Sequence, residues 1–172
     1  SPGTLRNEES RRRFIREAKA STMLSSPHTV RVYDYNVSQW GEPYLVMEFV
    51  SGANLYQVIK KEGAFDADRS VEILKQIAQS LMEAHALGLV HRDLKPSNIM
   101  LMQLKGHDEF VKIFDFGVVK FTDAPEEADL TRQGAVLGTP RYMAPEQIMS
   151  PGDVSFPADI FSLGLILFYM IT

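Results

Sequence analysis

The spacing of hydrophobic residues along the chain predicts three helices. From Glu8 to Leu24, apolar residues recur among charges at close to the helical period, which predicts an amphipathic helix. The same period returns from Val71 to His85, with Asp66 as the expected N-cap and Gly88 at the end. The third helix, from Ala158 to Ile171, is apolar on nearly all sides, so we expect it to lie deep in a core.

Runs rich in Val, Tyr and other strand-forming residues predict two hairpins. Residues Thr29 to Asn36 and Pro43 to Val50 suit two antiparallel strands. Two further apolar runs, Asn98 to Leu104 and Phe110 to Phe114, lie on either side of a polar turn from Lys105 to Glu109. The chain is therefore expected to combine helices with antiparallel strands.

Composition narrows the class of protein. With 172 residues, 45% hydrophobic and 23% charged, the chain is long enough for one domain with a core and has the composition of a soluble globular protein. The net charge of -4 gives no general reason to expect nucleic-acid binding, and the absence of cysteine excludes disulfides and thiolate metal sites. The apolar run from Ile160 to Ile171 is shorter than the ~20 residues of a membrane span, so we expect no span within this chain.

Three motifs follow one another in a set order. They are the eight residues from His91 to Asn98, then Asp115-Phe116-Gly117, and then Ala144-Pro145-Glu146. A single His-Arg-Asp or Asp-Phe-Gly is more often an ordinary loop or turn, but the whole series is hard to assemble by chance. Phosphoryl transfer needs a carboxylate at the attacking hydroxyl, oxygen ligands for Mg2+ and positive charge near the phosphate. These motifs contain all three.

Each role has a candidate residue. Asp93 is the expected general base, which accepts the proton of the attacking hydroxyl. Lys95 would neutralise the transferring phosphate as its charge shifts. Asn98 and Asp115, at the two ends of the second predicted hairpin, offer the hard oxygen ligands that Mg2+ prefers.

These motifs resemble the eukaryotic-type protein kinase family, and most of all its bacterial serine/threonine kinases. The resemblance covers nearly the whole chain and implies a two-lobed α+β fold of which this is the central piece. By this likeness, residues 1–50 would be part of the N-lobe with the hinge. Residues 51–172 would be part of the C-lobe, with the catalytic loop, the activation segment and a helix called F in the family.

The resemblance also implies a set of ATP-binding residues. Glu17 matches the helix-C glutamate that pairs with the ATP-binding lysine. The remaining matches are the gatekeeper Met47, the hinge Glu48, Phe49 and Val50 whose backbone would bind adenine, the ribose contact Asn54, and the apolar floor Met100. By residue type alone, the two methionines fit a hydrophobic core equally well.

The resemblance further implies a regulatory contact and a substrate class. Arg92 matches the arginine that binds a phosphorylated activation segment, and Thr131 is the first candidate phosphosite in the polar, irregular stretch from Val118 to Leu137, which predicts a mobile loop. Lys95 and Thr139 follow the serine/threonine pattern. The implied function is ATP- and Mg2+-dependent phosphorylation of protein Ser/Thr hydroxyls, in the cytoplasm or in the cytoplasmic domain of a membrane-anchored parent.

Two alternatives differ in chemistry. One is a pseudokinase or scaffold that binds nucleotide or partners without catalysis, which the complete set of catalytic residues disfavours. The other is a small-molecule phosphotransferase with a kinase-like fold, which usually has Gly in place of Arg92 and lacks the activation segment.

The chain also departs from the family pattern. Ser21, four residues after Glu17, is polar where the family usually places an apolar residue. Residues Ser1 to Asn7 contain one glycine and no Val-Ala-Ile-Lys-like stretch, so the sequence given holds no lysine partner for Glu17. We therefore expect activity from the parent protein, and inactivity and association through exposed surfaces from this piece alone.

Overall fold

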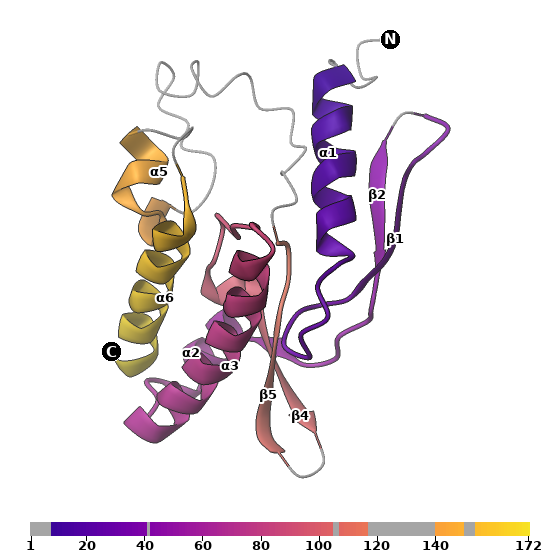
Figure 1. Cartoon of the computed structure of the whole chain (residues 1–172). Helices are drawn as coiled ribbons and strands as arrows, with labels where there is room; N and C mark the ends of the chain where they lie inside the picture. The colour runs from indigo at the N-terminus through magenta and orange to yellow at the C-terminus, as the bar shows by residue number, and fades with distance from the viewer. Residues whose placement is uncertain (1–7, 41, 105–106, 117–139, 150–153) are drawn as a thin grey trace.

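The computed structural model describes residues 8–40, 42–104, 107–116, 140–149 and 154–172 (Figure 1). Gly117, Thr131, Thr139 and the predicted loop from Val118 to Leu137 lie outside the described residues. None of the described helices is long and apolar enough to cross a membrane.

The N-terminal part is one helix beside one hairpin. Helix α1 (Glu8–Ser21) packs against strands β1 (Val32–Val37) and β2 (Pro43–Met47), which pair antiparallel, as the sequence predicted. Phe14, Ala18 and Ser21 are buried residues of α1. Figure 1 shows α1 and this hairpin standing together at one side of the molecule.

The second part is built on a three-stranded antiparallel sheet in the order β3-β4-β5. Its elements, in chain order, are β3 (Ala53–Asn54), α2 (Leu55–Glu62), α3 (Ala67–Ala86), the 3-10 turn η1 (Pro96–Asn98), β4 (Ile99–Leu104), β5 (His107–Ile113), η2 (Pro140–Tyr142), α5 (Pro145–Met149) and α6 (Phe156–Ile171). The β4–β5 hairpin was predicted, but β5 begins at His107, inside the expected polar turn.

The predicted cap of α3 is confirmed. Asp66 Oδ1 accepts a hydrogen bond from the Arg69 N–H at 2.8 Å, and the helix starts at the next residue, Ala67. The helix ends at Ala86, and Gly88 follows with a φ of 76°, a conformation that glycine adopts without steric cost. Its buried face packs on β5 and α6.

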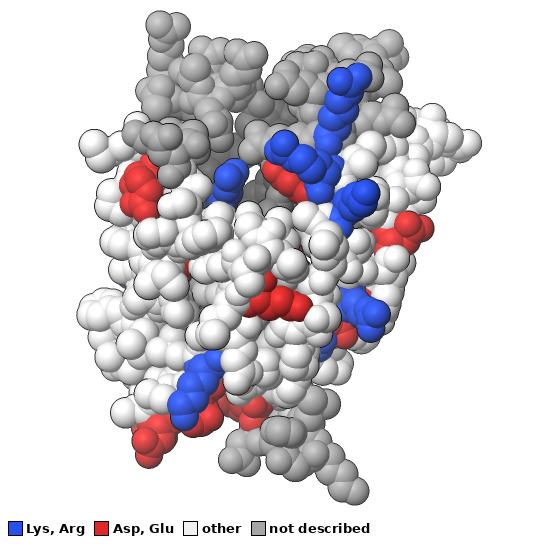
Figure 2. All heavy atoms as spheres, viewed as in Figure 1, with Lys and Arg blue, Asp and Glu red and all other residues white. Residues whose placement is uncertain are grey.

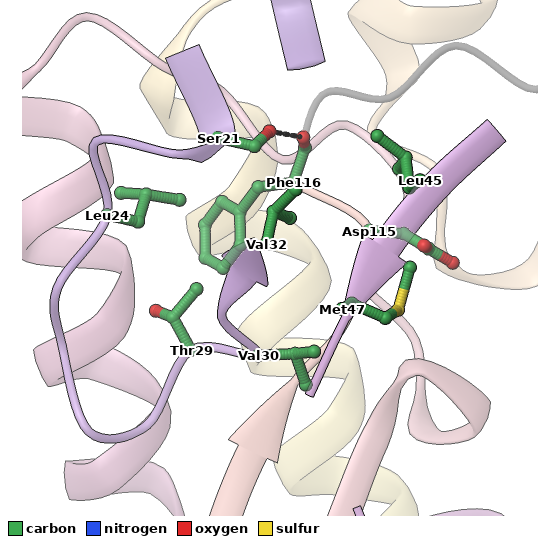
Figure 3. Close-up of a pocket in the computed structure, with 9 residues that line it drawn as sticks. All are labelled: Ser21, Leu24, Thr29, Val30, Val32, Leu45, Met47, Asp115 and Phe116. Atoms are coloured by element: carbon green, nitrogen blue, oxygen red, sulfur yellow. Dashed lines mark hydrogen bonds between the residues drawn. The ribbon is translucent and has the colours of Figure 1, made fainter. Parts of the chain in front are cut away.

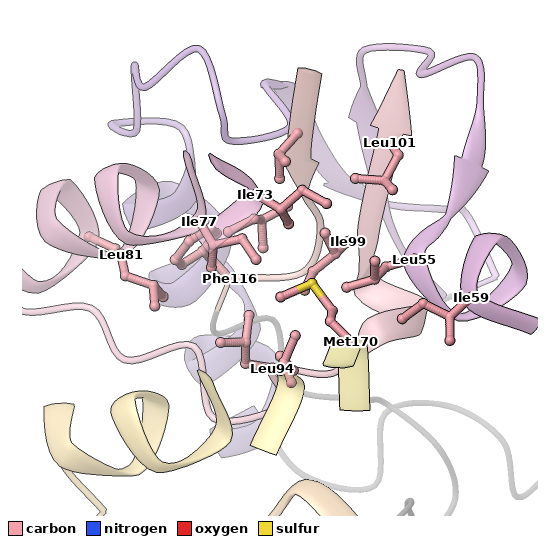
Figure 4. Close-up of a cluster of buried hydrophobic side chains, with 14 of the residues drawn as sticks. Leu55, Ile59, Ile73, Ile77, Leu81, Leu94, Ile99, Leu101, Phe116 and Met170 are labelled. Carbon is pink, nitrogen blue, oxygen red and sulfur yellow. The ribbon is translucent and has the colours of Figure 1, made fainter. Parts of the chain in front are cut away.

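One buried cluster joins helices, sheet and the loop before η1 (Figure 4). It includes Ile73, Ile77 and Leu81 of α3, Ile99 and Leu101 of β4, and Ile166 and Met170 of α6. Leu94, in the predicted catalytic loop, is 1% exposed and belongs to the same cluster. The loop is therefore anchored in the core by an apolar side chain.

The expectation that α6 lies deep in a core is met by one face of the helix only. Ala158, Ile166 and Met170 are buried, whereas Ile160 and Phe168 are 57% and 63% exposed. The helix packs on α3 and η2, and other apolar residues of the helix, including Phe161 and Ile171, remain exposed. A uniformly apolar sequence therefore does not tell which of its faces is enclosed.

An ion pair connects the end of β2 with β5. The Glu48 carboxylate accepts a hydrogen bond from the Arg31 N–H at 2.8 Å and another from the ammonium of Lys112, which also donates to the Thr29 carbonyl at 3.3 Å. Burial by itself raises the pKa of Glu48, but the hydrogen bonds from Lys112 and Arg31 outweigh it, so the pKa lies below the ordinary value of 4.5.

Charges are otherwise spread over the surface. Figure 2 shows acidic and basic side chains scattered among uncharged ones on one face, with no single large patch of either sign. Arg69 joins several elements, because its guanidinium donates to Glu109 of β5 and Glu62 of α2 and stacks 3.7 Å from the Phe65 ring centroid.

We predict that Ile77→Ala lowers the free energy of unfolding by about 2 to 5 kcal/mol, because it leaves a cavity in the cluster that holds α3 against the sheet. The matched control is Met82→Ala on the same helix, since Met82 is 70% exposed and should change stability by less than about 0.5 kcal/mol. Urea unfolding of the chain measures both. Equal losses would contradict the assignment of this core.

We predict that Glu48→Gln lowers the free energy of unfolding by about 1 to 3 kcal/mol at pH 7, because it removes a charge-assisted contact to Lys112. Since the folded pKa of Glu48 is lowered, its contribution is complete above pH 4.5 and lost as pH falls through the lower folded value. Unfolding of wild type and variant across pH 3 to 7 measures this difference.

The control for the Glu48 variant is Glu72→Gln. Glu72 also contacts a lysine, Lys75, but its side chain is 65% exposed, and exposed pairs contribute only about 0.2 to 1 kcal/mol. If Glu48→Gln lowers the free energy of unfolding as much at pH 3 as at pH 7, the ion pair with Lys112 is not the origin of the loss.

Candidate active site

A buried carboxylate on α6 holds the backbone of the predicted catalytic loop. Asp159, which is 1% exposed, accepts hydrogen bonds from the His91 N–H and the Arg92 N–H, each at 2.9 Å. Its Oδ2 also lies 2.8 Å from His85 Nε2 of α3. A carboxylate buried among apolar residues requires such donors, and here they come from the loop and α3.

Sequence reasoning missed Asp159 as part of the site. The signal was present, because Asp159 is the only charged residue between Ala158 and Ile171. An isolated carboxylate at the start of an apolar helix predicts a buried polar partner. The partner itself is 67 to 68 residues away in sequence, so only the fold identifies it.

The Arg92 backbone is held in an uncommon conformation. Its φ of 65° lies in the left-handed region, which is strained for a residue with a side chain. The Arg92 N–H bonds to Asp159, and its carbonyl accepts from Gln147 Nε2 of α5 at 2.6 Å. Gln147 was not identified from the sequence. The Arg92 side chain itself is exposed.

His91 connects the loop to the end of β5. Its Nε2 lies 2.8 Å from the Phe114 carbonyl, which can only accept, so Nε2 carries the proton. Its Nδ1 then accepts from the Asp93 N–H at 3.3 Å. Burial lowers the pKa of His91, which keeps the imidazole neutral and preserves this pattern of one donor and one acceptor.

The structure brings three predicted site residues together. Lys95 Nζ lies 3.0 Å from Oδ1 and 2.8 Å from Oδ2 of Asp93. Asn98 Nδ2 donates to the Asp93 carbonyl oxygen at 2.9 Å and lies 3.3 Å from Asp93 Oδ2. Both neighbours are hydrogen-bond donors and therefore suit an ionised carboxylate. Because the Asn98 nitrogen is engaged with Asp93, its Oδ1 is the atom suited to bind a cation.

Asp115 lies next to this cluster through strand pairing. Ile99 pairs with Ile113, and the Phe114 N–H donates to the Asn98 carbonyl at 3.0 Å, so Asp115 follows directly after the residue opposite Asn98. The Asp115 side chain is exposed, and its backbone has a φ of 61°. Arg92 and Asp115 are the two described residues other than glycine with positive φ.

The donor set fits a hard cation. The Asn98 amide oxygen and the Asp115 carboxylate are the kinds of oxygen that Mg2+ binds. Among the described residues, no group of three or more His, Asp or Glu side chains could hold a metal ion. Two protein ligands nevertheless suit Mg2+, which keeps several waters and binds substrate phosphates.

Met47 lines a pocket between the two parts of the chain (Figure 3). Residues from the end of α1, from β1 and β2, and from the Asp115–Phe116 turn form its wall. Figure 3 shows the Phe116 ring and the Asp115 carboxylate pointing to opposite sides, with Met47 on the Asp115 side. Met47 is the last residue of β2, so the half-buried Glu48 and Val50 begin the connection from β2 to β3.

Asn54 and Met100 are cross-strand partners in β3 and β4. Asn54 also has a role that the sequence analysis did not predict, as the N-cap of α2. Its Oδ1 accepts from the Gln57 N–H at 2.9 Å, and Gln57 Oε1 accepts from the Asn54 N–H at 3.0 Å. The reciprocal cap uses the backbone N–H and the side-chain Oδ1 of Asn54, so the side-chain nitrogen Nδ2 is the atom suited to a ligand contact.

Glu17 lies on α1, half-buried and one turn before Ser21. Its carbonyl accepts a hydrogen bond from Ser21 Oγ at 3.1 Å. The structure therefore places Glu17 on the helix that borders the Met47 pocket.

The chain is similar in sequence to known protein kinases. A family model for the protein kinase domain matches residues 4–172. The chain is 38% identical over 169 residues to the serine/threonine-protein kinase pkn3 of Myxococcus xanthus, covering 98% of this chain and 31% of that protein. It is 42% identical over 158 residues to PknA of Mycobacterium tuberculosis, covering 90% and 35%. The chain thus spans about a third of the length of these relatives.

Solved structures show the same fold. The PknI kinase domain of Mycobacterium tuberculosis matches with a TM-score of 0.74 and 26% identity, covering 99% of this chain and 60% of that one. Rad53 in complex with AMP-PNP matches with a TM-score of 0.73 and 31% identity, covering 92% and 37%. With a family model matched over nearly its whole length and the fold of these domains, the chain belongs to the protein kinase family.

Proposed function

We propose that the full-length protein transfers the γ-phosphoryl group of ATP to serine or threonine hydroxyls of protein substrates. The observation that carries this proposal is the contact of Asp93 with both Lys95 and Asn98, beside Asp115. The names of the relatives pkn3 and PknA, both serine/threonine kinases, support the choice of hydroxyl. No observation favours a pseudokinase, because each residue that the chemistry requires in this region is present.

In the proposed reaction, the substrate hydroxyl attacks the γ-phosphorus and the bond to the bridging oxygen of ADP breaks. Asp93 accepts the hydroxyl proton through the carboxylate oxygens that face Lys95 and Asn98. Lys95 lies close enough to Asp93 to contact the transferring phosphate as it approaches the base. A fixed ammonium there stabilises charge that develops on the phosphate oxygens.

Mg2+ would neutralise and orient the phosphates when bound. Asn98 Oδ1 and the Asp115 carboxylate would hold it, because both are hard oxygen ligands that the β4–β5 pairing brings together. The left-handed backbone of Asp115 is the kind of strain that persists where neighbouring contacts fix a functional side chain.

The nucleotide would bind between the two parts of the chain. The Glu48 N–H is engaged with the Arg31 carbonyl at 2.9 Å, so adenine would bind the Glu48 carbonyl and the Val50 backbone. Met47 and Met100 would contact the base, and the Asn54 amide nitrogen would reach the ribose. Binding of AMP-PNP by the similar Rad53 structure supports this role.

Arg92 and Glu17 would each form an ion pair, Arg92 with a phosphorylated residue and Glu17 with a lysine. The exposed Arg92 guanidinium would pair with a phosphorylated residue, for which Thr131 is the candidate. Glu17 would pair with the lysine that binds the ATP phosphates.

We predict that Asp93→Asn in the full-length protein lowers the phosphorylation rate by about 10²- to 10⁴-fold, because the amide cannot accept the hydroxyl proton. A radiolabelled-phosphate assay on a Ser/Thr substrate measures it, with thermal melting to confirm folding. The control is Asp68→Asn, an exposed carboxylate on α3. Unchanged turnover in Asp93→Asn would exclude Asp93 as the base.

We predict that Asp115→Ala weakens binding of Mg2+-ATP by about tenfold or more but leaves adenosine binding unchanged, because the carboxylate contacts the metal and not the base. Calorimetric titration of the full-length protein with each ligand measures both affinities. Equal losses for the two ligands would indicate a misfolded variant rather than a lost metal ligand.

A further inference from the structure

Ser21 makes a buried hydrogen bond to the backbone beside Asp115. The residue ends α1 and is 3% exposed. Its hydroxyl donates to the Phe116 carbonyl at 2.9 Å, which Figure 3 shows as a dashed line near the top of the view. The same hydroxyl lies 3.1 Å from the Glu17 carbonyl, so one hydrogen is shared between two acceptors.

The Ser21 hydroxyl donates a hydrogen bond, which an apolar side chain at this position cannot do. Phe116 is 4% exposed, and its carbonyl lies where water has little access. A buried acceptor without a donor costs about 1 to 3 kcal/mol, so the hydroxyl of Ser21 stabilises this orientation of the Phe116 carbonyl. The family usually places an apolar side chain at this position, which could pack against Phe116 but could not donate.

Asp115 is strained, and both of its neighbours are anchored. Before it, Phe114 donates to the Asn98 carbonyl at 3.0 Å and accepts from His91 Nε2 at 2.8 Å. After it, the Phe116 ring packs edge-on against the His91 ring, with 4.8 Å between the ring centroids, and the Phe116 carbonyl accepts a hydrogen bond from Ser21. A left-handed φ of 61° persists at a non-glycine residue because such contacts over-determine it.

We propose that Ser21 is a positioning residue that fixes the Asp115 carboxylate for Mg2+ through its hydrogen bond to Phe116. This inference rests on the proposed function, in which Asp115 is a metal ligand. Removing the hydroxyl frees the Phe116 carbonyl to rotate, and the strained Asp115 backbone then loses the restraint on its C-terminal side. The carboxylate samples more orientations, so it binds the cation less tightly.

The hydrogen bond also couples α1 to the metal site. Ser21 is fixed to the helix by its bond to the Glu17 carbonyl, one turn earlier. A displacement of α1 by the length of one hydrogen bond breaks the contact with Phe116. The orientation of Asp115 therefore depends on the position of the helix that carries Glu17.

The test is the Mg2+ dependence of two readouts in the full-length protein at fixed ATP, namely ATP binding measured by calorimetric titration and the rate of phosphorylation. The Mg2+ concentration for half-maximal binding is expected to shift with that for half-maximal rate. In Ser21→Ala, the free Mg2+ concentration for half-maximal rate rises about tenfold. This is the lower end of the loss in metal affinity that follows when a residue supporting a metal ligand is removed. Ser21→Thr retains the hydroxyl and restores the wild-type value. A merely structural role would lower the maximal rate without moving the Mg2+ requirement.

The matched control is Thr22→Ala. Thr22 is the next residue, and its hydroxyl donates to the Lys19 carbonyl at 2.7 Å on the exposed side. This variant keeps the wild-type Mg2+ requirement. An unchanged requirement in Ser21→Ala, or no rescue by Ser21→Thr, overturns the inference.

Asp115→Ala separates the inference from the proposed function. If this variant has an altered Mg2+ requirement and Ser21→Ala does not, the inference alone fails. If Asp115→Ala also leaves the Mg2+ requirement unchanged, the proposed metal role fails, and the inference fails with it.

Discussion

The site depends on one buried interaction, the capture of two successive backbone N–H groups by the Asp159 carboxylate. A carboxylate with 1% exposure is stable only with full hydrogen bonding, and its donors are His91, Arg92 and His85. The predicted catalytic loop therefore supplies hydrogen bonds that the buried Asp159 of α6 needs, and Asp159 in return fixes the backbone of the loop. Removing the Asp159 carboxylate would leave the N–H groups of His91 and Arg92 without an acceptor. Displacing the loop would leave the buried carboxylate without these donors.

From this anchor, hydrogen bonds continue to the candidate metal ligands. His91 donates to the Phe114 carbonyl, and Phe114 donates to the Asn98 carbonyl. Asn98 in turn donates to the Asp93 carbonyl oxygen. His91 Nδ1 also accepts from the Asp93 N–H, which only a neutral imidazole can do, and burial favours that form by lowering the pKa of His91. Asp93, the proposed base, and Phe114, the residue before Asp115, are thus oriented by the same network.

Backbone strain is concentrated where this network is densest. Arg92 and Asp115 are the two non-glycine residues with a left-handed backbone in the described part of the chain. Asp159 and Gln147 hydrogen-bond the backbone of Arg92, and hydrogen bonds to Phe114 and Phe116 hold the residues on either side of Asp115. Such conformations cost about 1 to 3 kcal/mol each and persist because the surrounding contacts outweigh that cost. The hydrophobic cluster around Leu94 provides the rigid support.

The sequence by itself determined three of the helices, the two hairpins and the family. Helical period and the Asp66 cap located α3, the β4–β5 hairpin was predicted nearly in full, and the order of motifs pointed to the kinase family, because these signals are local. Tertiary structure alone decided the partner of Asp159, the cap made by Asn54, the exposed face of α6 and the Ser21 contact. Each of these features depends on how the chain folds around the residue. A local period or motif does not show which distant residues will be in contact.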